Sequence, residues 1–331
     1  MYDYASLFSI TNLMLEKVSS IMKKIGKIDI YNDLNKMPIL RKNNRIKSIH
    51  SSLAIEANSL SFEQVRDVID GKIVIGKQKE IQEVKNAYEA YMEIKNIDPY
   101  SLNELKRIHG IMTYLVANNS GKFRIGGEGV FDENGECIHI CPPASEVTYL
   151  MKQLFKWLKD NKDNIHPLIL SSIFHYEFVF IHPFSDGNGR MARLWQNVIL
   201  SKYEEIFEYV PIESEIKKYQ NDYYKAIADC NSNGNSTIFI EFILKMIDEV
   251  LNDLISGVNS QINHINLYMK KLLDKMEYGI SYSINELMEL VNIKSKSSFR
   301  INYLNPAIEN SLIKMTYPDS PTSKNQTYYK V

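Results

Sequence analysis

The sequence of 331 residues has only three cysteines, Cys137, Cys141 and Cys230. A small, odd number of cysteines argues against a disulfide framework and favours a reducing compartment. Glycine and proline are also scarce, with 14 and 10 residues. Such low numbers argue against an all-β architecture with many turns and against low-complexity linkers.

Neither sign of charge is in excess, because 39 Lys and Arg face 40 Asp and Glu, for a formal net charge of -1. A general electrostatic attraction to nucleic acid or to an anionic membrane is therefore not expected, which leaves room only for a local basic patch. The sequence also lacks a run of about 18 apolar residues, so no membrane-spanning helix is predicted. The first six residues resemble no signal peptide. We therefore expect a cytoplasmic protein.

Helical periodicity dominates what is present. Hydrophobic residues make up 44% of the chain, enough for a sizeable core. Apolar residues at helical spacing predict helices over 61–70, 78–97, 101–117, 145–161, 166–180, 187–200, 214–232, 238–255 and, as a connecting helix, 262–276. We accordingly predict an all-α fold.

One segment departs from the helical pattern. Residues 130–133 and 136–140 flank Asn134-Gly135, a pair that favours positive φ and therefore predicts a β-hairpin with a two-residue turn. The alternation Cys-Ile-His-Ile-Cys over 137–141 would place both cysteines and the histidine on one strand face. A metal site there would need further ligands, so a half-buried strand face is the favoured interpretation.

The C-terminal residues change in character. Two short helices over 283–291 and 297–310, followed by two strands over 312–317 and 326–331, have the order of a winged helix. Nine Lys or Arg and six Asp or Glu in 261–331 make this part only weakly basic. DNA binding is therefore a weaker interpretation than protein docking or support of a dimer.

The segment with the most chemical information runs from His182 to Arg193 and reads His-Pro-Phe-Ser-Asp-Gly-Asn-Gly-Arg-Met-Ala-Arg. Gly187 and Gly189 allow a tight turn and the close approach of a ligand. Because a new helix begins here, its N-terminal N–H groups form an anion site, to which Asn188 adds an amide donor.

Charged side chains complete this segment. Arg190 and Arg193 are three residues apart on one helical face, an arrangement that suits several phosphate oxygens. Asp186 supplies a carboxylate of the kind that Mg²⁺ needs beside phosphates. His182 can take a proton from an attacking hydroxyl. The alternative, a glycine-rich helix start with surface ion pairs, does not explain why all these groups occur together.

These twelve residues resemble the complete signature of the Fic (filamentation induced by cAMP) family, H-x-F-x-[DE]-[GA]-N-[GK]-R-x-x-R. The resemblance implies an all-helical core with one β-hairpin flap that holds a target segment by strand addition. It also implies transfer of AMP from ATP to a protein hydroxyl, with Mg²⁺. His182 would be the general base and Asp186 the metal ligand. Residues 187–189 would form the anion hole, and Arg190 and Arg193 would hold the outer phosphates.

Two further segments extend the resemblance. Tyr223-Tyr224 and Asn231 resemble the family's adenine-side elements, with ordinary helix packing of the tyrosines as the alternative. The segment from Ser52 to Glu56 resembles the family's inhibitory motif, [ST]-x-x-x-E-[GN], in which Glu56 would pair with Arg193. Ala57 stands where Gly or Asn is expected, which predicts weaker inhibition.

The resemblance also suggests an organisation of the whole chain. We expect an N-terminal helical region with the inhibitory helix over 1–98, a Fic core over 99–258 and a winged-helix domain over 259–331. The expected function is a protein adenylyltransferase that acts on a target protein or on itself, and family habit favours a homodimer. Transfer of another phosphate ester, removal of AMP, and a DNA-binding regulator are the alternatives.

Overall fold

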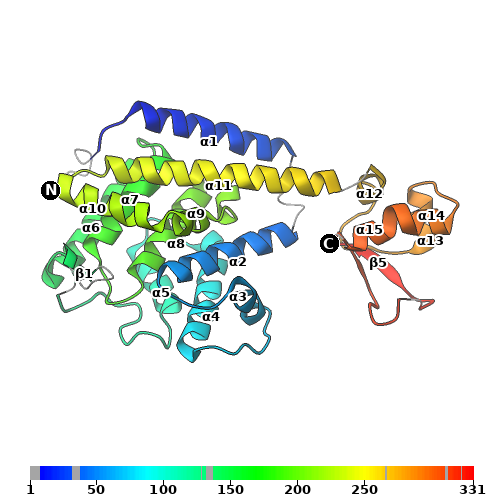
Figure 1. Ribbon diagram of the computed structural model, residues 1–331, viewed down its shortest axis with the longest axis horizontal. Helices are drawn as coiled ribbons and strands as arrows, with labels where there is room; N and C mark the ends of the chain where they lie inside the picture. The colour runs from blue at the N-terminus through cyan, green and yellow to red at the C-terminus, as the bar shows by residue number, and fades with distance from the viewer. Residues whose placement is uncertain are drawn as a thin grey trace. The chain divides into compact units, whose positions relative to one another are not determined.

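The computed structural model in Figure 1 describes residues 8–31, 38–127, 129–131, 137–264, 267–309, 312–321 and 323–331. It forms two compact units, with the division between Asp253 and Leu254. The helices of the first unit are α1 (Asn12–Tyr31), α2 (Pro38–Ile55), α3 (Phe62–Ile69), α4 (Gln78–Met92), α5 (Leu102–Met112), α6 (Ala144–Asn161), α7 (Pro167–Ile181), α8 (Asn188–Tyr203), α9 (Ile212–Lys218), α10 (Gln220–Asn233) and the first part of α11 (Thr237–His264). A hairpin of β1 (Gly129–Phe131) and β2 (Cys137–Ile140) follows α5. The predicted all-α fold with one β-hairpin is confirmed.

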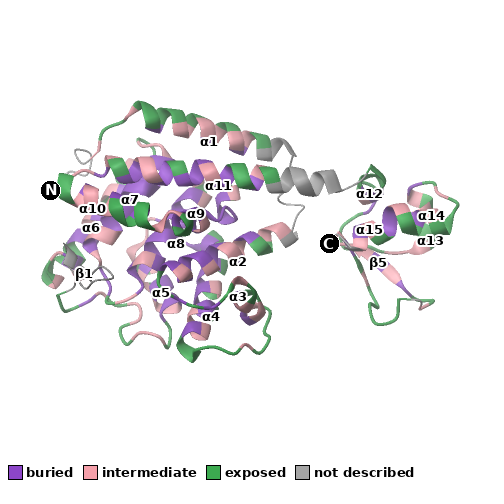
Figure 2. Cartoon of the chain, viewed as in Figure 1, coloured by how far each residue is buried: buried purple, intermediate pink, exposed green. Residues whose placement is uncertain are grey.

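Helices α7 and α8 form the centre of the first unit, and buried residues line most of both helices in Figure 2. Helix α7 is apolar around most of its circumference, as expected of a helix that is surrounded by others. On α8, Trp195 is fully buried, and its indole N–H donates to the carbonyl of Pro99 at 3.1 Å. The segment that joins these two helices is therefore held between rigid elements.

Helix α1 runs alongside α11 (Figure 1), and one carboxylate joins the two. Asp248 accepts a hydrogen bond from Ser20 Oγ at 2.7 Å and pairs with Lys17 Nζ at 3.1 Å and with Lys24. These contacts attach α1 to α11.

Some predicted helix limits are right and others are wrong. The capping box at Ser61 and Gln64 begins α3 as predicted. The single helix predicted over 214–232 is wrong, because the backbone breaks at Tyr219 (φ −110°, ψ 38°) into α9 and α10. The connecting helix predicted over 262–276 is also wrong in its limits, since α11 continues to His264 and α12 covers only Leu267–Leu273.

The hairpin is antiparallel, with Gly129 opposite Ile140 and a register shift between Val130 and Phe131. Its turn at Asn134-Gly135 lies outside the described residues. The side chains of Cys137 and His139 lie outside them too.

The second unit contains α12, β3 (Ser281–Ser283), α13 (Ile284–Leu290), α14 (Lys296–Phe299), a π-helical turn (Arg300–Leu304), α15 (Asn305–Glu309), β4 (Ile313–Met315) and β5 (Thr327–Lys330). Its antiparallel sheet has the strand order β3-β5-β4, so it includes a first strand that the sequence analysis did not predict. Leu287, Phe299 and Tyr328 are buried in its core. The winged-helix interpretation stays a prediction. Across the described ranges, every helix is too short or too polar to cross a membrane.

Candidate active site

The segment from His182 to Gly187 connects α7 to α8 and forms the motif loop. His182 ends α7 in the left-handed conformation (φ 50°, ψ 61°), and Gly187 precedes α8 with φ 82°. A side chain at Gly187 would be strained by that φ and would approach Thr113 Cγ2 at 3.0 Å. The loop therefore turns tightly between two buried helices and leads into the N-terminus of α8, where free backbone N–H groups favour an anion.

Arg124 holds the beginning of the motif loop. Its guanidinium is buried, with Nε donating to the carbonyl of His182 at 2.7 Å and Nη2 to that of Ile181 at 3.3 Å. Its backbone N–H donates to the carbonyl of Pro183 at 2.9 Å. Three successive carbonyls at the end of α7 thus bond to one residue of another segment.

Asn188 and His109 hold the rest of the loop. The Asn188 amide accepts from the N–H of Phe184 at 2.9 Å and donates to its carbonyl at 2.7 Å. His109 Nδ1 accepts from the N–H of Gly121 at 2.9 Å, so Nε2 carries the proton that bonds to the carbonyl of Asp186 at 2.9 Å. Burial lowers the pKa of His109 to about 4, which keeps it neutral. The Asn188 amide thus supports the loop, and its contribution to an anion site stays a prediction.

The half-buried imidazole of His182 has its Nδ1 3.4 Å from the carbonyl of Val179. A carbonyl only accepts hydrogen bonds, so this contact favours the tautomer with the proton on Nδ1. Nε2 is then the basic nitrogen. This is the protonation state that a general base needs.

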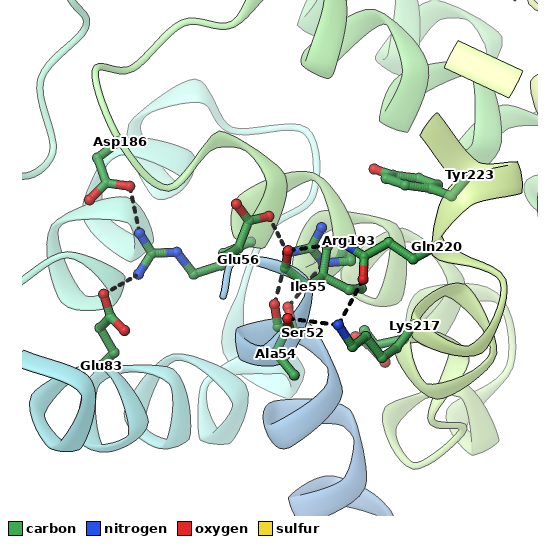
Figure 3. A network of polar contacts seen from close by, with 12 residues as sticks. Ser52, Ala54, Ile55, Glu56, Glu83, Asp186, Arg193, Lys217, Gln220 and Tyr223 are labelled. Atoms are coloured by element: carbon green, nitrogen blue, oxygen red, sulfur yellow. Dashed lines mark hydrogen bonds and ion pairs between the residues drawn. The ribbon is translucent and has the colours of Figure 1, made fainter. Parts of the chain in front are cut away.

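Asp186 and Arg190 form an ion pair at the start of α8, 2.7 Å between Oδ1 and Nη2 (Figure 3). Arg190 is buried, and its Nη1 lies 3.9 Å from Oε1 of Glu83, a residue that the sequence analysis did not identify. Nε and Nη1 of Arg190 have no hydrogen-bond partner among the described residues. A buried guanidinium with unused donors can donate hydrogen bonds to phosphate oxygens.

The residues present fit Mg²⁺ in one specific way. The described part of the chain has no cluster of three or more His, Cys, Asp or Glu that could enclose a metal ion. Mg²⁺ is commonly held by one or two carboxylates together with substrate phosphates. Asp186, whose side chain is 39% exposed beside the anion site, could supply that carboxylate.

Arg193 lies one turn further along α8 and pairs with the end of α2 (Figure 3). The buried guanidinium donates from Nη2 to Glu56 Oε1 at 2.7 Å and to the carbonyl of Ser52 at 3.0 Å, and from Nε to Ser52 Oγ at 3.1 Å. Burial opposes the charged form, but the Glu56 carboxylate together with Tyr223 and Tyr91 outweighs it, so the pKa of Arg193 is raised. The structure thus brings Ser52, Glu56 and Arg193 together as predicted.

Gly189 and Ala57 both affect the contact between Glu56 and Arg193. An added Cβ at Gly189 would lie 2.2 Å from Glu56 Oε1, so any other residue there would force the Glu56 carboxylate to move. Ala57 has φ 63°, the left-handed conformation that glycine adopts readily. The N–H of Ala57 bonds to the carbonyl of Ala54, and that of Asn58 to Leu53, which is the Schellman arrangement at a helix end.

The last turn of α2 is also held from outside (Figure 3). Lys217 Nζ donates to the carbonyl of Ala54 at 3.0 Å, and Gln220 Nε2 to that of Ile55 at 3.2 Å. The carbonyl of Ile55 has no partner within α2, so a side chain of α10 satisfies it, whereas Lys217 of α9 adds a second bond to the carbonyl of Ala54, which also accepts from the Ala57 N–H. Nothing in the sequence pattern indicated this contact, because it joins segments over 160 residues apart.

The predicted adenine-side residues have different environments. Tyr223 is buried, and its hydroxyl lies 3.0 Å from His175 Nε2, so its environment favours the packing alternative. Tyr224 is 40% exposed. Asn231 is half-buried and accepts a hydrogen bond from the Tyr176 hydroxyl at 2.8 Å. Tyr224 therefore has the exposure that stacking on a base requires, and Tyr223 does not.

Comparisons with known proteins agree with this geometry. The Fic/DOC family matches residues 99–200, and the Filamentation induced by cAMP protein Fic-like, C-terminal domain matches residues 268–329. The curated relatives named Protein adenylyltransferase Fic include those of Culex quinquefasciatus, 28% identical over 66% of this chain and 43% of theirs, and Nematostella vectensis, 27% identical over 72% and 55%. The chain thus spans about half the length of these relatives.

The solved structures include a match over nearly the whole chain. The crystal structure of a Fic family protein from Desulfovibrio desulfuricans G20 is 39% identical to this chain, covers 98% of both chains and superposes with a TM-score of 0.74. Fic-1 from C. elegans shares the fold, with a TM-score of 0.63 over 75% of this chain. On the signature at 182–193, the geometry around it and this full-length match, the chain belongs to the Fic family.

Proposed function

We propose that the chain is a protein adenylyltransferase, which transfers AMP from ATP to a Ser, Thr or Tyr hydroxyl of a protein. The observation that carries this proposal is the arrangement around α8, where a basic histidine, an anion site and two buried arginines occur together. Curated relatives that match about two thirds of the chain carry this activity in their names.

The proposed reaction balances as one in-line displacement. The target hydroxyl oxygen forms a bond to the α-phosphorus of ATP, the bond from that phosphorus to the bridging oxygen breaks, and pyrophosphate leaves. The hydroxyl proton goes to Nε2 of His182. The N–H groups of residues 187–189 and the side chains of Arg190 and Arg193 would hold the phosphates.

Mg²⁺ brought by ATP would bind Asp186 and neutralise charge on the phosphates. Arg190, now paired with Asp186, would then turn to a phosphate oxygen. The hairpin would hold the target by strand addition, because a two-stranded sheet leaves backbone groups at both outer edges.

Glu56 would inhibit this reaction. Its carboxylate occupies Arg193, which is therefore denied to the γ-phosphate. Removal of AMP, with Glu56 positioning water, is the alternative that the same contact supports. A homodimer, DNA binding by the second unit and a cytoplasmic location stay predictions.

The test uses the full chain and its Glu56→Gly variant with α-labelled ATP and a lysate, followed by mass spectrometry of labelled proteins. AMP attached to a hydroxyl side chain in a reaction that Glu56→Gly accelerates would support the proposal. Attachment of UMP or phosphate would show that the chain transfers another phosphate ester. Loss of AMP from a premodified protein would show that it catalyses the removal of AMP.

A further inference from the structure

Arg124 contacts a second region besides the motif loop. Its Nη1 donates to the carbonyl of Gly126 at 2.8 Å, and its Nη2 to that of Pro142 at 2.6 Å. Gly126 lies three residues before β1, and Pro142 lies two residues after β2. One buried side chain thus bonds to both ends of the hairpin and to the end of α7.

The chemistry of the side chain makes this link stiff. A guanidinium has five N–H donors in one rigid plane, and Arg124 uses four of them on carbonyls of Gly126, Pro142, Ile181 and His182. The geometry of the plane therefore fixes where these carbonyls lie relative to one another. A lysine has a similar length and the same charge, but its donors radiate from one atom and cannot reproduce the plane.

We infer that Arg124 is a positioning residue that sets the hairpin relative to the imidazole of His182. The inference rests on the proposed function for its catalytic consequence, because the hairpin would hold the target and His182 would accept its proton. It does not involve the residues proposed to bind the phosphates, since none of the four hydrogen bonds from the Arg124 guanidinium goes to residues 187–193. Arg124 thus aligns the hydroxyl with its base and leaves ATP binding to other residues.

Amide hydrogen exchange tests the link without any assay of activity. In Arg124→Lys, exchange should accelerate together in peptides covering 137–143 and 178–187. Arg107→Lys is the matched control, because Arg107 also makes several hydrogen bonds, to Glu93 and Glu104, but none to either segment. Acceleration of one segment alone, or of neither, would overturn the inference. If Arg124→Lys does not fold, hydrogen exchange of the unaltered chain tests the link instead. We then expect the peptides covering 137–143 and 178–187 to show the same free energy of opening.

Transfer kinetics test the catalytic consequence in the Glu56→Gly background. We expect Arg124→Lys to lower kcat about 10- to 100-fold, the order of loss that misalignment by about 1 Å causes. KM for ATP and the binding of ATP should stay within about twofold. Equal kcat in parent and variant would refute the positioning role. If neither chain transfers AMP while the two segments still exchange together, the proposed function fails and the link stands.

Discussion

Ala57→Gly should strengthen inhibition by Glu56. Ala57 occupies the left-handed C′ position of the Schellman motif that ends α2. The preceding residue, Glu56, carries the carboxylate that pairs with Arg193. Strain at Ala57 therefore bears directly on the segment that presents Glu56, and relief of that strain should favour the paired state.

The magnitude follows from two opposing terms. The left-handed conformation costs a non-glycine residue about 1–2 kcal/mol. Glycine avoids that cost but loses about 0.5–1 kcal/mol more conformational entropy when it is ordered. The net gain for Ala57→Gly is about 0.5–1 kcal/mol, which corresponds to a roughly two- to fivefold lower activity.

The effect of Ala57→Gly can be compared with that of removing the Glu56 carboxylate. A hydrogen bond between charged groups contributes about 1.5–3 kcal/mol, and the 39% exposure of the Glu56 side chain reduces this to about 1–2 kcal/mol. Glu56→Gly should therefore raise activity about 5- to 30-fold.

The assay is the initial rate of AMP transfer for the unaltered chain, both single variants and the double variant. Ala57→Gly should lower the rate only when Glu56 is present, because its effect acts through that carboxylate. Two results would refute the reasoning: a faster Ala57→Gly chain, or an equal decrease in the double variant. Thermal unfolding of all four chains separates a change in inhibition from a change in overall stability.

Three further changes have defined outcomes. His182→Ala should lower AMP transfer about 10²- to 10⁴-fold with ATP affinity nearly unchanged, since the phosphates bind elsewhere; equal label incorporation would contradict it. Asp186→Ala, like EDTA, should abolish transfer if this carboxylate holds Mg²⁺, and full activity in EDTA would rule out that role. His109→Gln should remove part of the acid sensitivity of folding. The unfolded chain protonates this histidine near pH 6.5 but the folded chain only near pH 4, so the free energy of unfolding falls, by up to about 3 kcal/mol, as the pH drops between these values. Denaturant titrations at pH 7 and pH 4.5 should show a smaller difference for the variant.

Local rules predicted the elements of the site well. The glycine-rich start of α8, the capping box of α3 and the hairpin all depend on the conformational preferences of residues that are close in the sequence. These preferences can be recognised from the sequence alone. Spacing also predicted that Ser52 and Glu56 share a helix face, because residues four apart do so. Their contact with Arg193 came from the family resemblance, since no local rule joins residues 137 positions apart.

The supporting contacts could not be predicted in this way. Arg124 lies in a loop, and loop arginines are ordinarily solvated, so only the fold shows that this one is buried against four carbonyls. His109 lies on the buried face of α5, four residues after Leu105, and nothing in the sequence shows its polar partners until Gly121 and Asp186 are placed beside it. The break at Tyr219 has no glycine or proline to mark it, and the tertiary packing of α9 and α10 sets it.

The two charged arginines of the signature are stabilised in the same way, each by one carboxylate. Each is buried, and an unpaired charge in such a place costs several kcal/mol. Asp186 pairs with Arg190, and Glu56 pairs with Arg193. ATP and Mg²⁺ could replace both pairs in one exchange, with the metal taking Asp186 and phosphate oxygens taking the arginines. If Glu56 inhibits as we propose, the same carboxylate would also be the counter-ion that buried Arg193 needs before ATP binds, and one contact would serve both inhibition and stability.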